Sequence, residues 1–315
     1  MNQESDSNAR QPTDDNREEI SNSDTKHRVA RSRLVPTDHS LAFSESIASE
    51  LGLPFDRDQT AQHSQELTTR YFNDIASVVP DYTSGISLEQ GSINSLEAFV
   101  EPFQNQSWVF VDDHLDIWLF GLNILTLFKA CYRTSKEEEE KLSDWVNQYL
   151  SISMTSDPHQ SNIVLREETR KLFVNYAILL PVANALSVSM MTFIICHEIA
   201  HNYLGHLEQP VSPKLEMEAD ELAYDLFLRV AHQREQLTNA QIDESTTCAP
   251  ALMMVYLKAL NVKTLGEDIG TNQHPPASDR LTALIEMGKT NWSDSSMEKF
   301  TELKKQFEFL FSLTS

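Results

Sequence analysis

The sequence predicts a mostly α-helical fold of the α+β class, in which helices surround a small β-sheet. The first observation is that apolar residues recur with a helical period in residues 58–79, 113–132, 135–154 and 293–313. The second is that residues 107–113, SWVFVDD, are aromatic and β-branched and end at acidic turn residues, which is typical of a strand. We expect one or two further strands beside it, so the predicted sheet is small.

The 315 residues divide into a polar tail and one predicted domain. Residues 1–37 are polar, mixed in charge and without the apolar core of a secretory signal, so we expect them to be disordered. Residues 38–315 are expected to form a single domain, because no internal repeat divides them. Within this domain, residues 38–165 form a helical N-terminal part, and residues 166–315 form the part that carries the motifs described below.

Charge and cysteine content narrow the classes of function. The formal net charge of −22 opposes close contact with nucleic acid or with an anionic membrane surface, and no basic patch after residue 40 offsets it. The three cysteines, Cys131, Cys196 and Cys248, are widely spaced and lie in apolar surroundings. We therefore predict buried free thiols rather than a disulfide framework, and a cytoplasmic location.

An uncharged segment, residues 172–196, is about long enough to cross a bilayer. A proline and several polar residues interrupt it, and it continues without a charged flank into His197. We therefore predict two consecutive core helices, one ending near Leu186 and the next beginning at Ser187 or Ser189, where serine is a suitable N-cap. A membrane-spanning helix is the alternative.

The apolar segment leads directly into the motif His197-Glu198-Ile199-Ala200-His201. Residues four apart lie on one face of an α-helix, about 40° from each other, so both histidines can bind the same metal ion. Glu198 projects about 100° from His197, where it can accept a proton from a metal-activated water without ligating the metal. The spacing therefore indicates hydrolysis of a carbonyl compound, with Glu198 as the general base.

A catalytic zinc site needs a third protein ligand, because three ligands leave one position open for water. His206 lies about 160° from the mean direction of His197 and His201 unless the helix has already ended at Gly205, and we predict that it is a capping or surface residue.

The next helix supplies better candidates. Residues 212–233 begin with Ser-Pro, a suitable N-cap and first position, and Glu216 and Asp220 both fall on the border of the apolar face of this helix. A carboxylate there needs a cationic partner. We assign Glu216 as the third zinc ligand and Asp220 as the acceptor for the second N–H of a ligating histidine. Solvent-facing Glu218 is the alternative ligand, and an ion pair with a buried Arg280 is the alternative role for the two acids.

Three motifs in this order, HEIAH, EMEAD and HPPASDR, resemble those of the gluzincin metallopeptidases, in particular the family of HtpX and the CAAX prenyl endopeptidases. The matching residues of the second and third motifs are Glu216, Asp220, His274, Pro275 and Arg280. The short distance from His201 to Glu216 is also similar to that in the soluble ImmA/IrrE peptidases and the Lit-type phage-exclusion peptidases. The resemblance implies a zincin-like catalytic domain with one zinc ion per chain.

We therefore expect a soluble zinc endopeptidase that cleaves a protein or peptide substrate. In this interpretation His274 donates a hydrogen bond to the oxyanion, as a second catalytic residue beside Glu198, and Arg280 braces Asp220 or Glu216. Two alternatives remain open. One is a non-catalytic interaction protein with a structural zinc or an ion-pair network, and the other is a membrane-associated protease of the HtpX type.

Overall fold

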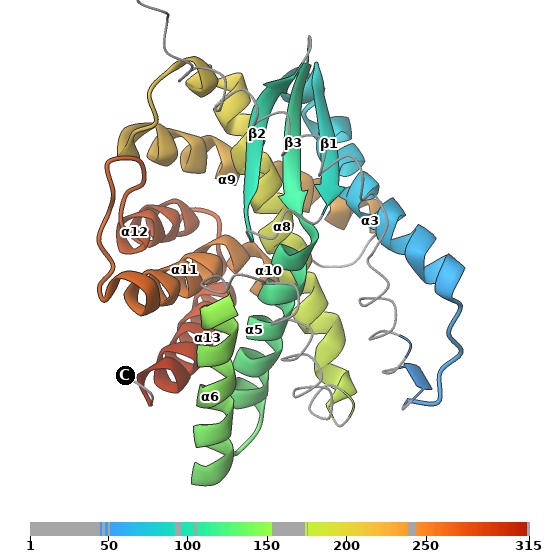
Figure 1. Ribbon diagram of the computed structural model, residues 1–315, viewed down its shortest axis with the longest axis vertical. Coiled ribbons are helices and arrows are strands. Elements are labelled where there is room, and N and C mark those ends of the chain that lie inside the picture. The colour runs from blue at the N-terminus through green and yellow to red at the C-terminus, as the bar shows by residue number, and fades with distance from the viewer. Residues whose placement is uncertain are drawn as a thin grey trace, which may run out of the picture.

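The computed structural model describes residues 51–91, 96–103, 106–152, 176–238 and 244–313, together with positions 45, 48, 49 and 174. Helices dominate this part of the chain, and a single small sheet packs against them in the upper part of the view in Figure 1. The predicted fold class, mostly α with a small sheet, is confirmed. The predicted disordered tail, residues 1–37, lies outside the described residues.

The sheet consists of three strands in the order β1-β3-β2. They are β1 (Ile86–Gly91), β2 (Ala98–Phe103) and β3 (Gln106–Asp112). The central strand β3 is parallel to β1 and antiparallel to β2, and Val109 lies opposite Leu88 on one side and Val100 on the other. Burial of Val109, Phe110 and Val111 explains why the aromatic and β-branched pattern of this segment predicted a strand.

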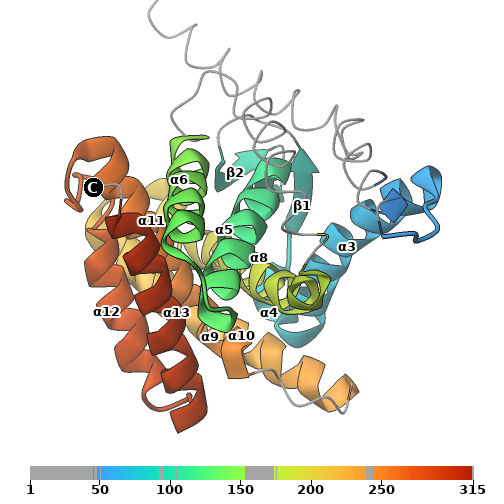
Figure 2. The same cartoon turned by 90° about the horizontal axis from the view of Figure 1, so that it is seen from below.

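The predicted helices are present with small shifts at their ends. They are α3 (Arg57–Val78), α5 (Asp113–Cys131), α6 (Lys136–Ile152) and α13 (Asp294–Ser312), and the chain also forms α4 (Pro80–Thr83), η1 (Ala177–Leu179), α10 (Glu244–Thr247), α11 (Ala249–Leu265) and α12 (Ala277–Gly288). Helices α5, α6 and α13 pack against one another at the end of the molecule seen from below (Figure 2). Trp118 of α5 donates a hydrogen bond of 2.6 Å to the backbone oxygen of Tyr149 on α6.

The apolar segment forms one continuous helix, α8 (Leu180–Tyr203), so the prediction of two helices is wrong. Ser187 does not cap a new helix, because its hydroxyl donates to the backbone oxygen of Ala183 at 3.0 Å and accepts from Asn123 at 3.0 Å. A serine that bonds back to the preceding turn can remain inside a helix. Tyr256 of α11 donates to the same Asn123 at 2.9 Å, so this buried polar network joins α5, α8 and α11.

Among the described residues, the segment Ala177–Tyr203 is the one stretch long and apolar enough to span a membrane by length and composition. Its most apolar window is 56% buried inside the protein, as expected for the core helix of a globular fold. It packs against α5, α9 and α11.

Helix α9 (Pro213–Thr238) follows α8 and packs along it. The apolar face predicted for this helix is directed inward, with Leu222 partly buried and the other six residues buried, namely Leu215, Ala219, Ala223, Leu226, Phe227 and Val230. The cysteine prediction holds in part. The structure has no disulfide, and Cys196 and Cys248 are buried. Cys131 is exposed because it is the last residue of α5, where the helix reaches the surface.

Candidate metal centre

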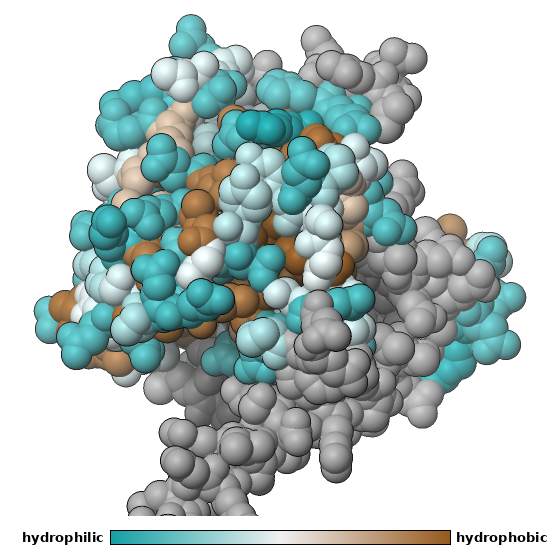
Figure 3. Space-filling model, turned by 90° about the horizontal axis from the view of Figure 1, so that it is seen from above, coloured by the Kyte–Doolittle hydropathy of each residue, from teal (hydrophilic) through white to brown (hydrophobic). Residues whose placement is uncertain are grey.

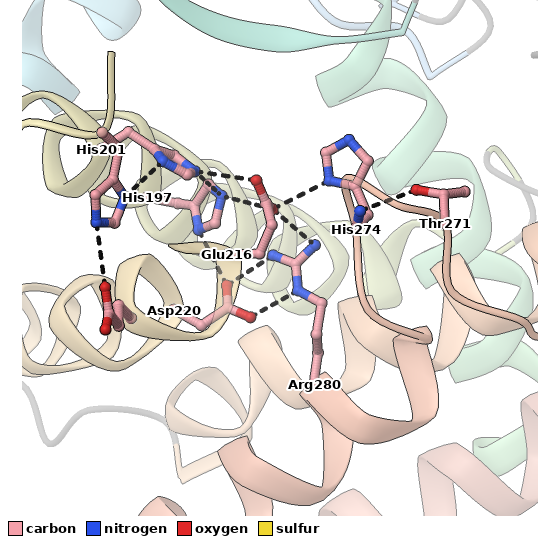
Figure 4. A network of polar contacts seen from close by, with 9 residues as sticks. His197, His201, Glu216, Asp220, Thr271, His274 and Arg280 are labelled. Atoms are coloured by element: carbon pink, nitrogen blue, oxygen red, sulfur yellow. Dashed lines mark hydrogen bonds and ion pairs between the residues drawn. The ribbon is translucent and has the colours of Figure 1, made fainter. Parts of the chain in front are cut away.

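The two histidines of the HEIAH motif meet the first turn of α9 where α8 and α9 lie side by side (Figure 4). The Nε2 atoms of His197 and His201 are 3.0 Å apart. Glu216 places its Oε2 atom 3.5 Å from His197 Nε2 and its Oε1 atom 3.3 Å from His201 Nε2. The ligand atoms of these three residues lie within 4.8 Å of one another.

These distances fit a tetrahedral metal ion. Four ligands at about 2.0 to 2.1 Å from a central ion stand about 3.3 Å from one another, which is close to the 3.0 Å between the two histidine nitrogens and to the 3.3 and 3.5 Å from each nitrogen to its nearer Glu216 oxygen. Two imidazole nitrogens and one carboxylate oxygen also form a donor set that zinc accepts in catalytic sites. The three side chains are thus able to hold a divalent metal ion and to leave its fourth position open.

Glu216 is held by the start of α9 and lies among cationic groups. The backbone N–H groups of Leu215 and Glu216 donate to the backbone oxygen of Ser212, which fixes the first turn of the helix. Burial, the largest single influence, raises the pKa of the Glu216 carboxyl, but hydrogen bonds from His197, His201 and His274 outweigh it. The pKa therefore lies well below its usual range, and Glu216 is ionised and able to act as a ligand.

On its other side His197 faces Asp220, which is almost completely buried. The Nδ1 atom of His197 is 3.0 Å from Asp220 Oδ1, although the two groups are not aligned as a linear hydrogen bond. Burial lowers the pKa of His197, but the carboxylates of Asp220 and Glu216 beside it outweigh burial and raise the pKa to about 9 in the metal-free protein. Asp220 thus lies where it can hold the proton of His197 on Nδ1 and leave Nε2 for a metal.

Arg280 binds Asp220 through both of its carboxylate oxygens. Its Nε atom donates to Oδ2 at 2.6 Å and its Nη2 atom donates to Oδ1 at 2.7 Å, while Nη1 is 3.7 Å from Glu216 Oε2. Arg280 lies in the first turn of α12, and the backbone N–H groups of Ala277 and Ser278 in the same turn donate to the Asp268 carboxylate. Capping of α12 by Asp268 therefore positions the guanidinium.

His274 lies on the loop before α12, with a side chain that is 55% exposed and with Nδ1 3.3 Å from Glu216 Oε2. The loop is held by two hydrogen bonds with Thr271, whose Oγ1 atom accepts from the His274 N–H at 2.9 Å and whose own N–H donates to the His274 carbonyl at 2.7 Å.

Glu198 is buried on α8, and this burial raises the pKa of its carboxyl above the ordinary value.

His206 was predicted to be a capping or surface residue, and that prediction is wrong because its side chain is only 4% exposed. Helix α8 ends at Tyr203, and Gly205 adopts a left-handed φ of 70°, so the chain turns before the short helix η2 (His206–Glu208). The turn places His206 Nδ1 3.0 Å from His201 Nδ1. Its Nε2 atom is 3.5 Å from an oxygen of Glu218, which is half-exposed and pairs with Lys214 at 3.1 Å.

A comparison with protein families finds that the model of the family described as Peptidase U49 matches residues 117–302, more than half of the chain. This range includes α8, α9 and the loop that carries His274. The family is Lit-like, in agreement with the resemblance to Lit-type peptidases, while the resemblance to HtpX stays a prediction. Neither the curated proteins nor the solved structures include a match.

Proposed function

Because the chain belongs to the peptidase U49 family, we propose that it is a zinc-dependent endopeptidase whose zinc is held by His197, His201 and Glu216. The observation that carries the proposal is the convergence of three side chains between two packed helices: the two histidine Nε2 atoms are 3.0 Å apart, and each lies 3.3 to 3.5 Å from one of the two carboxylate oxygens of Glu216. Membership of a peptidase family supports hydrolysis of peptide bonds, and this spacing supports a metal as the means.

When bound, a zinc ion supplies Lewis-acid chemistry that polarises a carbonyl group and makes a water molecule acidic near neutral pH. Glu198 is the general base in this proposal, because it follows His197 on the same helix and its carboxyl interacts electrostatically with His197, His201 and Glu216. Burial raises the pKa of the Glu198 carboxyl and so moves it toward neutral pH. A general base is most effective when its pKa is near the pH at which the enzyme works. Asp220 keeps the proton of His197 on Nδ1 throughout.

His274 is the proposed donor to the developing oxyanion. Its side chain is the exposed one among the histidines around Glu216, so it can reach a substrate that enters from solvent. Removal of one such donor typically lowers kcat by a factor of about 10² to 10³. The turn with Thr271 holds the backbone of His274 and so limits the positions that the ring can take.

The proposed substrate is an extended segment of a protein. Strand β2 lies at an edge of the sheet that the described residues form and packs against α8, and we propose that the substrate segment adds to this edge as a further strand. Large apolar side chains of the α8–α9 connection, Tyr203, Leu204, Leu207 and Val211, are exposed beside the site. The face seen from above is mostly hydrophilic and shows hydrophobic residues among the polar ones (Figure 3). We propose that the enzyme acts in the cytoplasm.

Metal content decides the proposal. We expect one zinc per chain in the purified wild type and in Glu198→Gln, and loss of the metal in Glu216→Ala, because that change removes a ligand. Glu221→Ala is the matched control, since Glu221 is an exposed acid on the same helix. Glu198→Gln should then bind peptide substrates without cleaving them. A wild type that holds no zinc, even after reconstitution, would mean that these residues form an ion-pair network only, and the proposal would be abandoned.

A further inference from the structure

We propose that His206 and Glu218 position His201 as a metal ligand, through a chain of polar contacts that runs from the site to the surface. The inference rests on the proposed function, since it assigns a role toward the zinc held by His201. Three observations carry it: the two Nδ1 atoms are 3.0 Å apart, the His206 side chain is buried, and its other nitrogen faces Glu218 at 3.5 Å.

The chain reaches this arrangement by ending α8 immediately after the motif. The N–H groups of Leu204 and Gly205 donate to the carbonyls of Ala200 and Asn202, which closes the last turn of the helix. Gly205 then takes a left-handed φ of 70°, a conformation that costs an L-residue with a side chain about 1 kcal/mol or more. The reversal directs the His206 ring back toward His201 instead of away from it.

The protons of this chain follow from the metal position. His201 Nε2 faces His197 and Glu216, so this nitrogen must be unprotonated to bind a metal, and the proton of the neutral ring is on Nδ1. His201 therefore donates from Nδ1, and His206 accepts at its own Nδ1. The proton of His206 is then on Nε2, where it is directed at the carboxylate of Glu218.

The result is that each ligating histidine has its own outer partner. His197 is oriented by Asp220, which Arg280 holds in the interior, whereas His201 is oriented by His206, which Glu218 holds at the surface. Partners of this kind fix the tautomer and the ring plane of a ligand, and their removal typically lowers metal affinity about 10- to 100-fold. His206 touches no substrate atom in this scheme and is a positioning residue.

Two substitutions separate the hydrogen bond from the packing. His206→Leu keeps much of the buried volume and removes the acceptor, so we expect its zinc dissociation constant to rise about 10- to 100-fold. His206→Asn keeps an acceptor near the position of Nδ1, and its affinity should return to within a few-fold of wild type. Glu218→Gln should weaken binding less, by several-fold, because the side chain of Glu218 is 42% exposed and water can replace the carboxylate.

The measurement is a competition titration of the metal-free full-length protein with zinc against a chelator of known affinity. The controls are His232→Leu, which changes a histidine of α9 about 24 Å along the helix from Glu216, and Glu221→Gln, which changes an exposed acid of α9. Both should bind zinc as the wild type does. In the background of His206→Leu, Glu218→Gln should have no additional effect, because the chain is already interrupted.

A dissociation constant of His206→Leu equal to that of the wild type would overturn the inference and leave the proposed function standing. A wild type that binds no zinc would instead refute the proposed function. Circular dichroism shows whether each variant is folded. If His206→Leu does not fold, the comparison of Glu218→Gln with Glu221→Gln decides, and equal affinities of these two variants would overturn the inference.

Discussion

Replacement of Asp220 by asparagine tests whether the buried pair with Arg280 holds the site together. The side chain of Asp220 is 1% exposed and that of Arg280 is 13% exposed, and they are joined by two hydrogen bonds of 2.6 and 2.7 Å. Asparagine has nearly the same shape, so the substitution removes the charge and one acceptor with little change in packing. The guanidinium is then left in the interior with Glu216, at 3.7 Å, as its remaining anionic partner.

The expected cost is large, because a buried charge loses its partner. Breaking a buried ion pair at one end typically lowers the free energy of unfolding by about 3 to 5 kcal/mol. Helix α9 offers a matched control in Asp225, which pairs with Arg229 at 2.6 Å while both side chains are about half-exposed. Water screens that pair, so Asp225→Asn should cost no more than about 0.5 kcal/mol.

The assay is urea unfolding of the metal-free protein at pH 7, followed by circular dichroism. The double variant Asp220→Asn/Arg280→Met should be more stable than Asp220→Asn alone, because it removes the unpaired charge together with its partner. Zinc affinity, measured separately, should fall about 10- to 100-fold in Asp220→Asn, since His197 loses the anion that orients it. Equal losses of stability in Asp220→Asn and Asp225→Asn would refute the reasoning, because burial would then have no influence on the strength of the pair.

Three further predictions concern the site and the core. Zinc must displace a proton from His197, whose pKa is about 9 in the metal-free protein. The apparent affinity for zinc should therefore rise about tenfold per pH unit as the pH increases toward 9. A zinc affinity that does not change with pH in chelator competition would contradict this. Gly121→Ala should lower the free energy of unfolding by about 1 to 3 kcal/mol, because its Cβ would lie 2.2 Å from the Tyr149 ring, and urea unfolding measures the loss. Tyr256→Phe should cost about 1 to 3 kcal/mol in the same assay, since it leaves the buried Asn123 oxygen without its donor, and an unchanged midpoint would argue against that hydrogen bond.

Much of the candidate site could be predicted from the sequence because its geometry is local. The four-residue spacing of His197 and His201 depends only on helix periodicity, and the structure has a helix there. Glu216 could be selected because it interrupts the apolar face of a helix, where a carboxylate without a cationic partner is costly. The structure places it 4% exposed beside both histidines. The catalytic roles of these residues stay predictions until the metal and the variants are measured.

The errors arise where one residue changes the path of the chain. The angle predicted for His206 assumed that α8 continues, whereas the helix ends at Tyr203 and Gly205 reverses the direction of the backbone. Gly205 was the signal in the sequence, since glycine commonly follows the last turn of a helix. Ser187 gave the opposite error, because its partner Asn123 is distant in sequence and helix periodicity alone does not reveal such a contact.

The charges around the candidate metal centre argue for a divalent cation. Glu198, Glu216 and Asp220 are buried carboxylates, and Arg280, with a side chain 13% exposed, pairs with the last two, so in this part of the described chain two negative charges remain to be balanced when all three acids are ionised. Charges in the interior are costly unless they are compensated. In the metal-free protein, protons bound to His197 and Glu198 can compensate these negative charges. The pKa values of both groups are raised, which favours their protonated forms. A divalent ion bound by His197, His201 and Glu216 would supply the same two positive charges, and in the proposed mechanism Glu198 would then be ionised and able to accept a proton from water.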